Sequence, residues 1–312
     1  MSAEWLSRKL IRVAQWLDSR SSAAVHPIAT QKPIHLRNLL GQLDRKLVVA
    51  DIGCRWGFAE QWMQFAPHVI LYGFDPDASE CERLRTLYQG MDVTLVAEAL
   101  ADVPSQRKLY LTKEPACSSL FRPDPKLTTT TPELACAIEI GTKEVTVTTL
   151  DIWAENAGVS VVDFVKLDTQ GAELDIFRGG AKTLGTVRAL EVEVEFNPIY
   201  ESQPLFGNID QYLRDRGFVL WRLANLAHYS RWRLSSQLQI PDHVHYDSVA
   251  VKHATRGGQL FWGNAFYVRA EIAEGSISGS LAQARRDSAL MLALGFNDLA
   301  ANLLDASARS GL

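Results

Sequence analysis

The sequence has few cysteines, no excess of basic residues and no long apolar run. Its 312 residues include four cysteines without C-x-x-C spacing, so neither a zinc site nor a disulfide framework is predicted. A formal net charge of −4 argues against sequence-independent nucleic-acid binding, which requires a basic surface. No run reaches the roughly 18 apolar residues of a membrane span, and the N-terminus lacks the apolar core of a secretory signal. We therefore expect a cytoplasmic protein with no bound metal, no nucleic-acid partner and no integral membrane span.

Composition and length indicate one large globular domain with helical additions at both ends. Hydrophobic residues make up 47% of the sequence and charged residues 22%, as in ordinary soluble proteins. An amphipathic pattern over 4–18 and the stretch after it predict an N-terminal helix and linker over 1–33. The basic helix could lie on an anionic membrane, but packing on the domain or on a partner subunit is the favoured interpretation. Alanine and leucine at helical spacing predict a helical extension over 273–312, which leaves 34–272 for the main domain.

From residue 47 onward, predicted strands and helices alternate, which indicates an α/β fold with a doubly wound, mostly parallel sheet. Strands are predicted at 47–52, 69–74, 93–97, 107–112, 145–149, 161–167, 187–196, 218–223 and 263–269. Helices are predicted at 56–66, 77–89, 172–184 and 207–216. The last two strands follow the last of these helices, which suits a sheet closed by an antiparallel hairpin. The irregular stretches 113–143 and 225–260 interrupt this pattern, and we expect them to determine which substrate is bound.

The most informative motif is Asp51-Ile52-Gly53-Cys54-Arg55-Trp56-Gly57, where the first strand ends. Glycines in such a turn let the backbone approach a ligand closely, and Asp75, after the second strand, can accept both ribose hydroxyls. The G-x-G-x-x-G pattern of dinucleotide sites would need glycine at the positions of Arg55 and Phe58. We therefore expect S-adenosyl-L-methionine as the cofactor rather than NAD. The expected cofactor-binding residues are Asp51, Gly53, Gly57 and Asp75, with Glu98 and Ala99 beside the adenine.

A second motif runs from Val161 to Glu173 and places an acid at the end of another predicted strand. Asp168 should emerge at the carboxyl edge of the sheet, where open α/β sheets bind ligands. It is our first candidate for a catalytic base, although an acid at this position can also serve as a helix cap or turn residue. Glu173 lies in the first turn of the next helix, and an alternative interpretation is that it only stabilises the helix dipole.

Three glutamates alternate with apolar residues in the strand before Phe196, namely Glu191, Glu193 and Glu195. A central parallel strand should be apolar on both faces. Either this strand lies near an edge and the carboxylates are solvated, or Glu193 and Glu195 face a polar pocket. Both interpretations stay open for Glu195.

His243 and His245 form the second candidate for the catalytic base. In an extended segment both imidazoles would lie on one face, as in a metal-binding pair; two such ligands are a weak signal, although Asp242 or Asp247 could supply an oxygen ligand. A surface position or a contact with substrate is the favoured interpretation.

These segments together resemble the FkbM-type S-adenosylmethionine-dependent methyltransferases over residues 47–270. The matching segments are ADIGCRWG, YGFDPDASECERL, AEALAD, VTVTTLDIWAENAG, VDFVKLDTQGAELDIFRGG, EVEVEFNPIYESQPLF and RGFVLW. The family block Lys-x-Asp-x-Glu-Gly-x-Glu is matched by Lys166, Asp168, Gly171 and Glu173, but Gln170 stands where the family has a glutamate.

The resemblance implies a Rossmann-like class I methyltransferase fold with a seven-stranded sheet, and a methyltransferase domain over 34–272. It also implies O-methylation of a hydroxyl on a small molecule, a sugar or glycan, or a secondary metabolite. The expected substrate-binding residues are Gln170, Glu173, Glu195 and Tyr200.

Two other hypotheses stay open: an NAD-type oxidoreductase with an atypical turn, and a cofactor-binding module that lost catalysis, suggested by Gln170. Helices at both ends of the chain make a homodimer possible.

Overall fold

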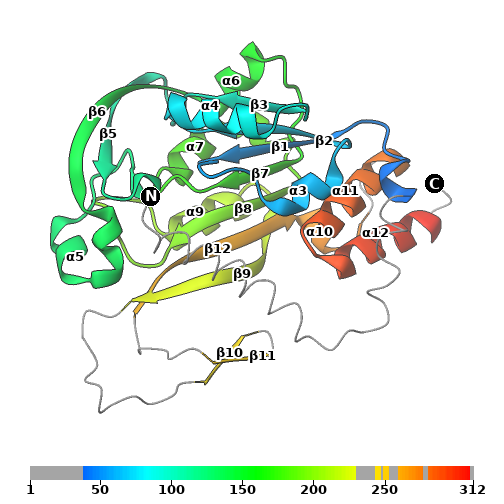
Figure 1. Cartoon of the computed structure of the whole chain (residues 1–312). Helices are drawn as coiled ribbons and strands as arrows, with labels where there is room; N and C mark the ends of the chain where they lie inside the picture. The colour runs from blue at the N-terminus through cyan, green and yellow to red at the C-terminus, as the bar shows by residue number, and fades with distance from the viewer. Residues whose placement is uncertain (1–37, 230–242, 247–248, 253–258, 277–279, 310–312) are drawn as a thin grey trace. The chain divides into compact units, whose positions relative to one another are not determined.

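The computed structural model describes residues 38–229, 243–246, 249–252, 259–276 and 280–309 (Figure 1). The chain divides into two compact units, Met1–Leu43 and Asp44–Leu312. The predicted helix over 4–18 lies outside the described residues. No helix in the described part of the chain is long and apolar enough to cross a membrane.

The larger unit is built on a seven-stranded sheet with the order β3-β2-β1-β7-β8-β12-β9. The strands are β1 (Leu47–Ile52), β2 (Val69–Phe74), β3 (Val93–Val96), β7 (Phe164–Leu167), β8 (Ala189–Glu195), β9 (Phe218–Tyr229) and β12 (Gln259–Arg269). The first five run parallel, whereas β12 pairs antiparallel with both β8 and β9. β12 is therefore an antiparallel strand placed next to the edge strand β9, as the predicted antiparallel hairpin requires, and the predicted mostly parallel seven-stranded α/β sheet is confirmed.

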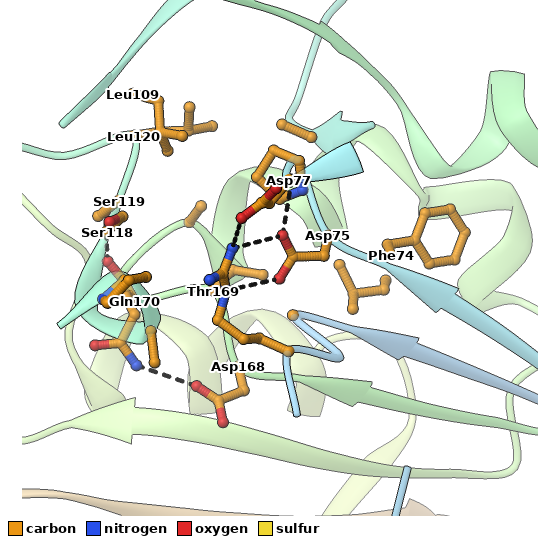
Figure 2. A pocket seen from close by; sticks show the side chains of 18 of the residues that line it. Phe74, Asp75, Asp77, Leu109, Ser118, Ser119, Leu120, Asp168, Thr169 and Gln170 are labelled. Carbon is orange, nitrogen blue, oxygen red and sulfur yellow. Dashed lines mark hydrogen bonds and ion pairs between the residues drawn. The ribbon is translucent and has the colours of Figure 1, made fainter. Parts of the chain in front are cut away.

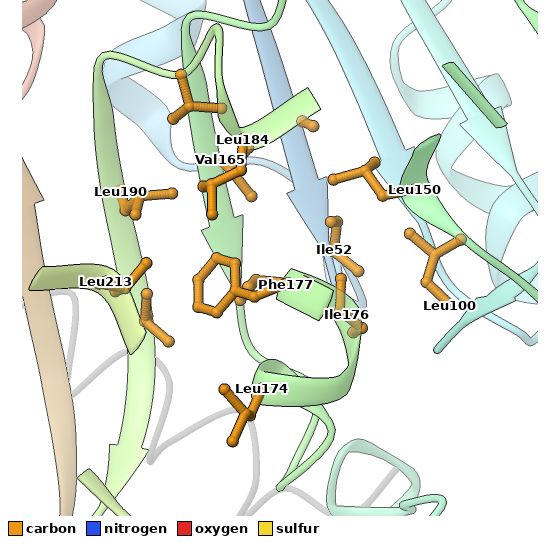
Figure 3. Close-up of a cluster of buried hydrophobic side chains, with 14 of the residues drawn as sticks. Ile52, Leu100, Leu150, Val165, Leu174, Ile176, Phe177, Leu184, Leu190 and Leu213 are labelled. Carbon is orange, nitrogen blue, oxygen red and sulfur yellow. The ribbon is translucent and has the colours of Figure 1, made fainter. Parts of the chain in front are cut away.

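One face of the sheet is covered by four helices, α6 (Leu150–Asn156), α7 (Glu173–Gly179), α8 (Ala181–Leu184) and α9 (Phe206–Arg214). Figure 3 shows their apolar side chains meeting those of the strands, with Phe177 of α7 close to Val165 and Leu190. Each fully buried side chain of this size contributes about 1.5–3 kcal/mol. Alternate residues of β1, β7 and β8 therefore point their side chains into this apolar cluster.

The opposite face carries α3 (Glu60–Phe65), whose Trp62 lies against Phe164 of β7 with ring centroids 5.2 Å apart. The predicted helix 56–66 begins only at Glu60, because Trp56 and Gly57 have φ values of 78° and 106°, outside the right-handed helix. The turn after β1 is therefore longer than the sequence indicates. The next helix, α4 (Ala78–Leu87), begins at the Asp77 cap and precedes β3.

A three-stranded sheet, β4-β6-β5, follows β3 in the chain. Its strands are β4 (Ala99–Leu100), β5 (Ser105–Thr112) and β6 (Glu139–Thr148). The stretch 113–143, predicted to be irregular, contains η2 (Pro115–Cys117), α5 (Pro125–Thr130), η3 (Pro132–Ala137) and the start of β6. These short elements begin at proline, which favours the first turn of a helix, and Asp124 caps α5 through the backbone N–H groups of Lys126 and Leu127.

The described parts of the predicted stretch 225–260 lie in strands. β9 continues to Tyr229 and β12 begins at Gln259, so both strands are longer than the predicted 218–223 and 263–269. Between them, β10 (His243–Tyr246) pairs antiparallel with β11 (Val249–Lys252). The predicted C-terminal helices are present as α11 (Leu281–Ala293) and α12 (Asn297–Arg309), after the short α10 (Ala270–Ala273).

Candidate functional site

A pocket of about 450 Å³ lies at the carboxyl ends of β1, β2 and β7, within the size range of small-molecule sites. Figure 2 shows Asp75 and Asp77 on one side of it, Asp168, Thr169 and Gln170 on another, and Leu109, Ser118, Ser119 and Leu120 near the β5 side. Predicted residues from three separate segments thus meet at one edge of the sheet.

The turn after β1 depends on Gly53, which has a φ of 87°. A Cβ atom at this position would lie 1.9 Å from the carbonyl oxygen of Asp168, so no side chain fits. Gly57 has a different role and does not line the pocket. A Cβ atom added at this position would lie 2.3 Å from the hydroxyl of Tyr88. One glycine sets the approach of β1 to β7, and the other lets α4 pack against the turn.

Asp75 lies at the end of β2, and its side chain is 5% exposed. Arg55 donates to both of its carboxylate oxygens at 3.2 and 3.3 Å, and to Asp77 at 2.7 Å. Burial raises the pKa of Asp75, while the Arg55 charge opposes this. The pKa of Asp77 is lowered to about 2, first by the Ser79 hydrogen bond and then by Arg55. In the sequence Arg55 only occupies a glycine position of the dinucleotide pattern, and nothing there predicts its contact with Asp75 and Asp77.

A row of polar side chains crosses the second face of the sheet at the same edge. Asp51 on β1 lies beside Lys166 on β7, which lies beside Glu191 on β8. The Lys166 ammonium is 3.4 Å from Asp51 and 3.5 Å from Asp168. Burial would lower the pKa of Lys166, but these carboxylates raise it. Asp51 therefore holds Lys166 beneath the pocket and does not itself line it.

The three glutamates of β8 are not solvated edge residues, because β8 lies between β7 and β12 in the sheet. The interpretation that placed this strand near an edge is wrong. Glu191 accepts a hydrogen bond from Asn264 at 3.0 Å, and burial raises its pKa to about 7. Glu193 and Glu195 are 9% and 1% exposed, and burial raises the pKa of both well above the ordinary value. Their alternation reflects one polar face and one apolar face of a central strand.

Asp168 and Glu193 are joined by the side chain of Gln170. Its Nε2 donates to Asp168 at 3.1 Å and to Glu193 at 2.5 Å. Burial would raise the pKa of Asp168, but the Lys166 charge and hydrogen bonds from Glu193 and Gln170 lower it. The pKa of Asp168 is therefore the lowered one of this pair and that of Glu193 the raised one, so Asp168 is the member that loses its proton first.

Glu173 and Tyr200 support the turn after β7 from outside the pocket. Glu173 accepts hydrogen bonds from the backbone N–H groups of Thr169 and Gly171 and from the Thr169 hydroxyl. The Tyr200 hydroxyl lies 2.9 Å from Gln170 Oε1 and 2.8 Å from the carbonyl oxygen of Cys117. Both residues are almost completely buried. They hold the loop that carries Asp168.

The structure brings some predicted site residues to the pocket and not others. Those lining it are Gly53, Asp75, Glu98, Ala99, Asp168 and Gln170. Those outside its lining are Asp51, Gly57, Glu173, Glu195 and Tyr200. His243 and His245 belong to β10, but their side chains lie outside the described residues. Lining residues that the sequence analysis did not select include Arg55, Asp77, Thr112, Ser119, Lys143 and Thr169.

The volume of the pocket and the chemistry of its lining residues suit S-adenosylmethionine. Leu100, Leu109 and Leu120 supply an apolar wall suited to a purine. The Asp75 carboxylate at the end of β2 can accept hydrogen bonds from a ribose diol, and Gly53 leaves the turn without a side chain. Within the described residues, no group of three or more His, Cys, Asp or Glu side chains is placed to hold a metal ion.

Methyltransferases are among the known proteins to which this chain is similar. Similar solved structures include the magnesium protoporphyrin IX methyltransferase ChlM of Synechocystis with bound S-adenosylmethionine, with 13% identity, a TM-score of 0.34, and coverage of 80% of this chain and 86% of that one. TrmK of M. capricolum with S-adenosylhomocysteine is 7% identical, with a TM-score of 0.33 and coverage of 87% and 96%. The 2-O-methyltransferase NoeI of Sinorhizobium fredii is 30% identical over 173 residues, which cover 52% of this chain and 70% of NoeI. The family model of the methyltransferase FkbM domain matches residues 51–220, more than half of the chain, and the chain belongs to this family of S-adenosylmethionine-dependent methyltransferases.

Proposed function

We propose that this enzyme methylates a hydroxyl group of a sugar, a glycan or a secondary metabolite. The main support is the meeting of two acids at one pocket: Asp75, suited to a ribose, and Asp168, ionised and directed to the same edge of the sheet. The similarity to a 2-O-methyltransferase favours oxygen as the accepting atom. A homodimer and a cytoplasmic location stay predictions of the sequence.

The cofactor is held by Gly53 and Asp75, with Glu98 and Ala99 beside the adenine, and Asp51 and Gly57 support the turn from behind. When bound, S-adenosylmethionine supplies an electrophilic methyl group on a sulfonium. The protein must orient an acceptor hydroxyl toward that group and receive the proton that the hydroxyl releases.

Asp168 is the proposed base. A carboxylate of low pKa can perform this role, because an alcohol oxygen becomes strongly acidic while its new bond to carbon forms. The side chain of Asp168 lines the pocket and is 34% exposed, so a hydroxyl can reach it, whereas Glu193 and Glu195 do not line the pocket. Within the described residues Tyr200 therefore acts on the acceptor only through the loop, by its contact with Gln170. His243 and His245 are the second candidates.

Calorimetric titration with S-adenosylmethionine, S-adenosylhomocysteine and NAD tests the cofactor assignment. We expect the first two to bind and NAD not to bind. Asp75→Ala should weaken their binding about 10- to 100-fold, because hydrogen bonds to a charged group are worth about 1.5–3 kcal/mol. Asp92→Ala, which removes a carboxylate paired with Lys46 outside the pocket, is the matched control and should bind normally.

Binding of NAD alone would contradict the proposal and restore the oxidoreductase hypothesis. Normal binding of S-adenosylmethionine without methyl transfer to any hydroxylated acceptor would favour a module that has lost catalysis.

A further inference from the structure

Gln170 is held in an uncommon backbone conformation. Its φ is 60°, in the left-handed region, and the following Gly171 has a φ of 105°. A non-glycine residue in this region is uncommon and is found most often where surrounding contacts fix it. Here the hydroxyl of Ser119 donates to the carbonyl oxygen of Gln170 at 2.7 Å. Ser119, which lines the pocket after β5, thus fixes the backbone of Gln170 and with it the direction of the side chain.

The side-chain amide of Gln170 is fully engaged with protein groups. Its two N–H hydrogens are directed to Asp168 and Glu193, and its oxygen lies within hydrogen-bond distance of the Tyr200 hydroxyl. An amide has two donor hydrogens, so none is left for an acceptor hydroxyl. A role in direct substrate binding, expected from the sequence, would require one of these bonds to break.

The charges around this amide explain why a neutral donor is suited to the position. Lys166 on β7 and Glu195 on β8 act on the two carboxyl groups that the amide bridges, and Asp51 on β1 and Glu191 on β8 act on Lys166. Glu173 from α7, Tyr200, and the thiols of Cys117 and Cys136 complete the set of titratable neighbours. Among the described groups named here the cation is Lys166, whose ammonium lies 3.4 Å from Asp51 and 3.5 Å from Asp168. A donor placed between Asp168 and Glu193 lets both lie close together without a second cation.

We propose that Gln170 is a positioning residue for methyl transfer: anchored by Tyr200, its amide bridges Asp168 and Glu193 and keeps the Asp168 carboxylate turned toward the acceptor. This inference rests on the proposed role of Asp168. It replaces the expectation that Gln170 marks lost catalysis, because the amide provides two donors where a carboxylate would provide none.

The pH profile of methyl transfer tests the bridge in Gln170→Met, which keeps the length of the side chain and removes both donors. Ionised Asp168 is the active form, so activity falls as the pH falls through its pKa. Losing a hydrogen bond to this charged group raises that pKa, and the acidic limb of kcat should move up by about one pH unit. Turnover should fall about 10-fold, with cofactor binding unchanged within about threefold. Tyr200→Phe, which frees the amide oxygen, should shift the limb in the same direction by less.

Gln106→Met is the matched control. Gln106 is exposed on β5, where its amide donates to Thr146 at 2.7 Å, and it does not line the pocket. Its profile should match that of the wild type. A Gln170→Met profile that keeps its acidic limb while turnover falls would show a merely structural role and overturn the proposal, as would unchanged turnover.

A second readout does not require methyl transfer. Carboxyl ¹³C NMR titration of the cofactor-free protein, assigned with Asp168→Asn, follows the apparent pKa values of the Asp168–Glu193 pair. We expect the value for Asp168 to rise in Gln170→Met and not in Gln106→Met. If no acceptor is methylated by the wild type, the proposed function fails, yet a shifted titration still supports the bridge. An unshifted titration overturns the bridge whatever the activity.

Discussion

Methyl transfer by the Asp168→Asn protein is expected to be at least about 100-fold slower than by the wild type, since a positioned base contributes roughly 10²- to 10⁴-fold. The change keeps the shape of the side chain and removes the charge that receives the proton. Cofactor affinity should stay within about threefold, because the proposed ribose contact belongs to Asp75 on a different strand. Single-turnover kinetics with a hydroxylated acceptor that the wild type methylates, together with calorimetry for the cofactor, separates the two effects.

The control for this change is Asp92→Asn. Asp92 pairs with Lys46 at 2.9 Å and is half exposed, so the same substitution also breaks a lysine ion pair, but outside the pocket. Equal turnover in the two variants would remove Asp168 from the chemistry and direct attention to His243 and His245. A loss of cofactor binding in Asp168→Asn would show that the loop after β7 serves the cofactor and not the acceptor.

The elements that the sequence predicted best are those with local signals. The bounds of β1 and β2 agree with the predicted 47–52 and 69–74, because each is a short apolar run that ends at turn residues. The pocket followed from the same signals, since Gly53, Asp75 and Asp168 each end a strand and parallel strands end at a common edge.

What the sequence could not give depends on contacts between distant segments. From the sequence alone, Glu193 is compatible with a solvated or a buried position. The hydrogen bond from Gln170, 23 positions away, appears only in the folded structure. In the sequence, Arg55 only departs from the glycine pattern of dinucleotide sites. In the structure its guanidinium donates hydrogen bonds to Asp75 and Asp77. Both cases involve charges that a single strand or turn cannot satisfy by itself, so their meaning depends on tertiary structure.

Gly53→Ala is expected to have the largest effect on stability. An alanine here must adopt the left-handed φ of 87°, at a cost of about 1–2 kcal/mol. Its Cβ would also lie 1.9 Å from the Asp168 carbonyl oxygen, and relieving such overpacking costs about 1–3 kcal/mol more. The contact is with backbone, so no side chain can rotate away. The turn after β1 must separate from the loop after β7, which carries Asp168, and cofactor binding and turnover should both be lost.

Gly90→Ala isolates the steric part of this prediction. Gly90 has nearly the same φ, 85°, but a Cβ there would meet nothing within 4 Å. It should lower the free energy of unfolding by only the left-handed cost of about 1–2 kcal/mol and leave cofactor binding normal. Thermal unfolding of both variants, measured beside calorimetry for the cofactor, gives the comparison. If Gly53→Ala were no less stable than Gly90→Ala and still bound the cofactor, the close approach of β1 to β7 would not be what shapes the pocket.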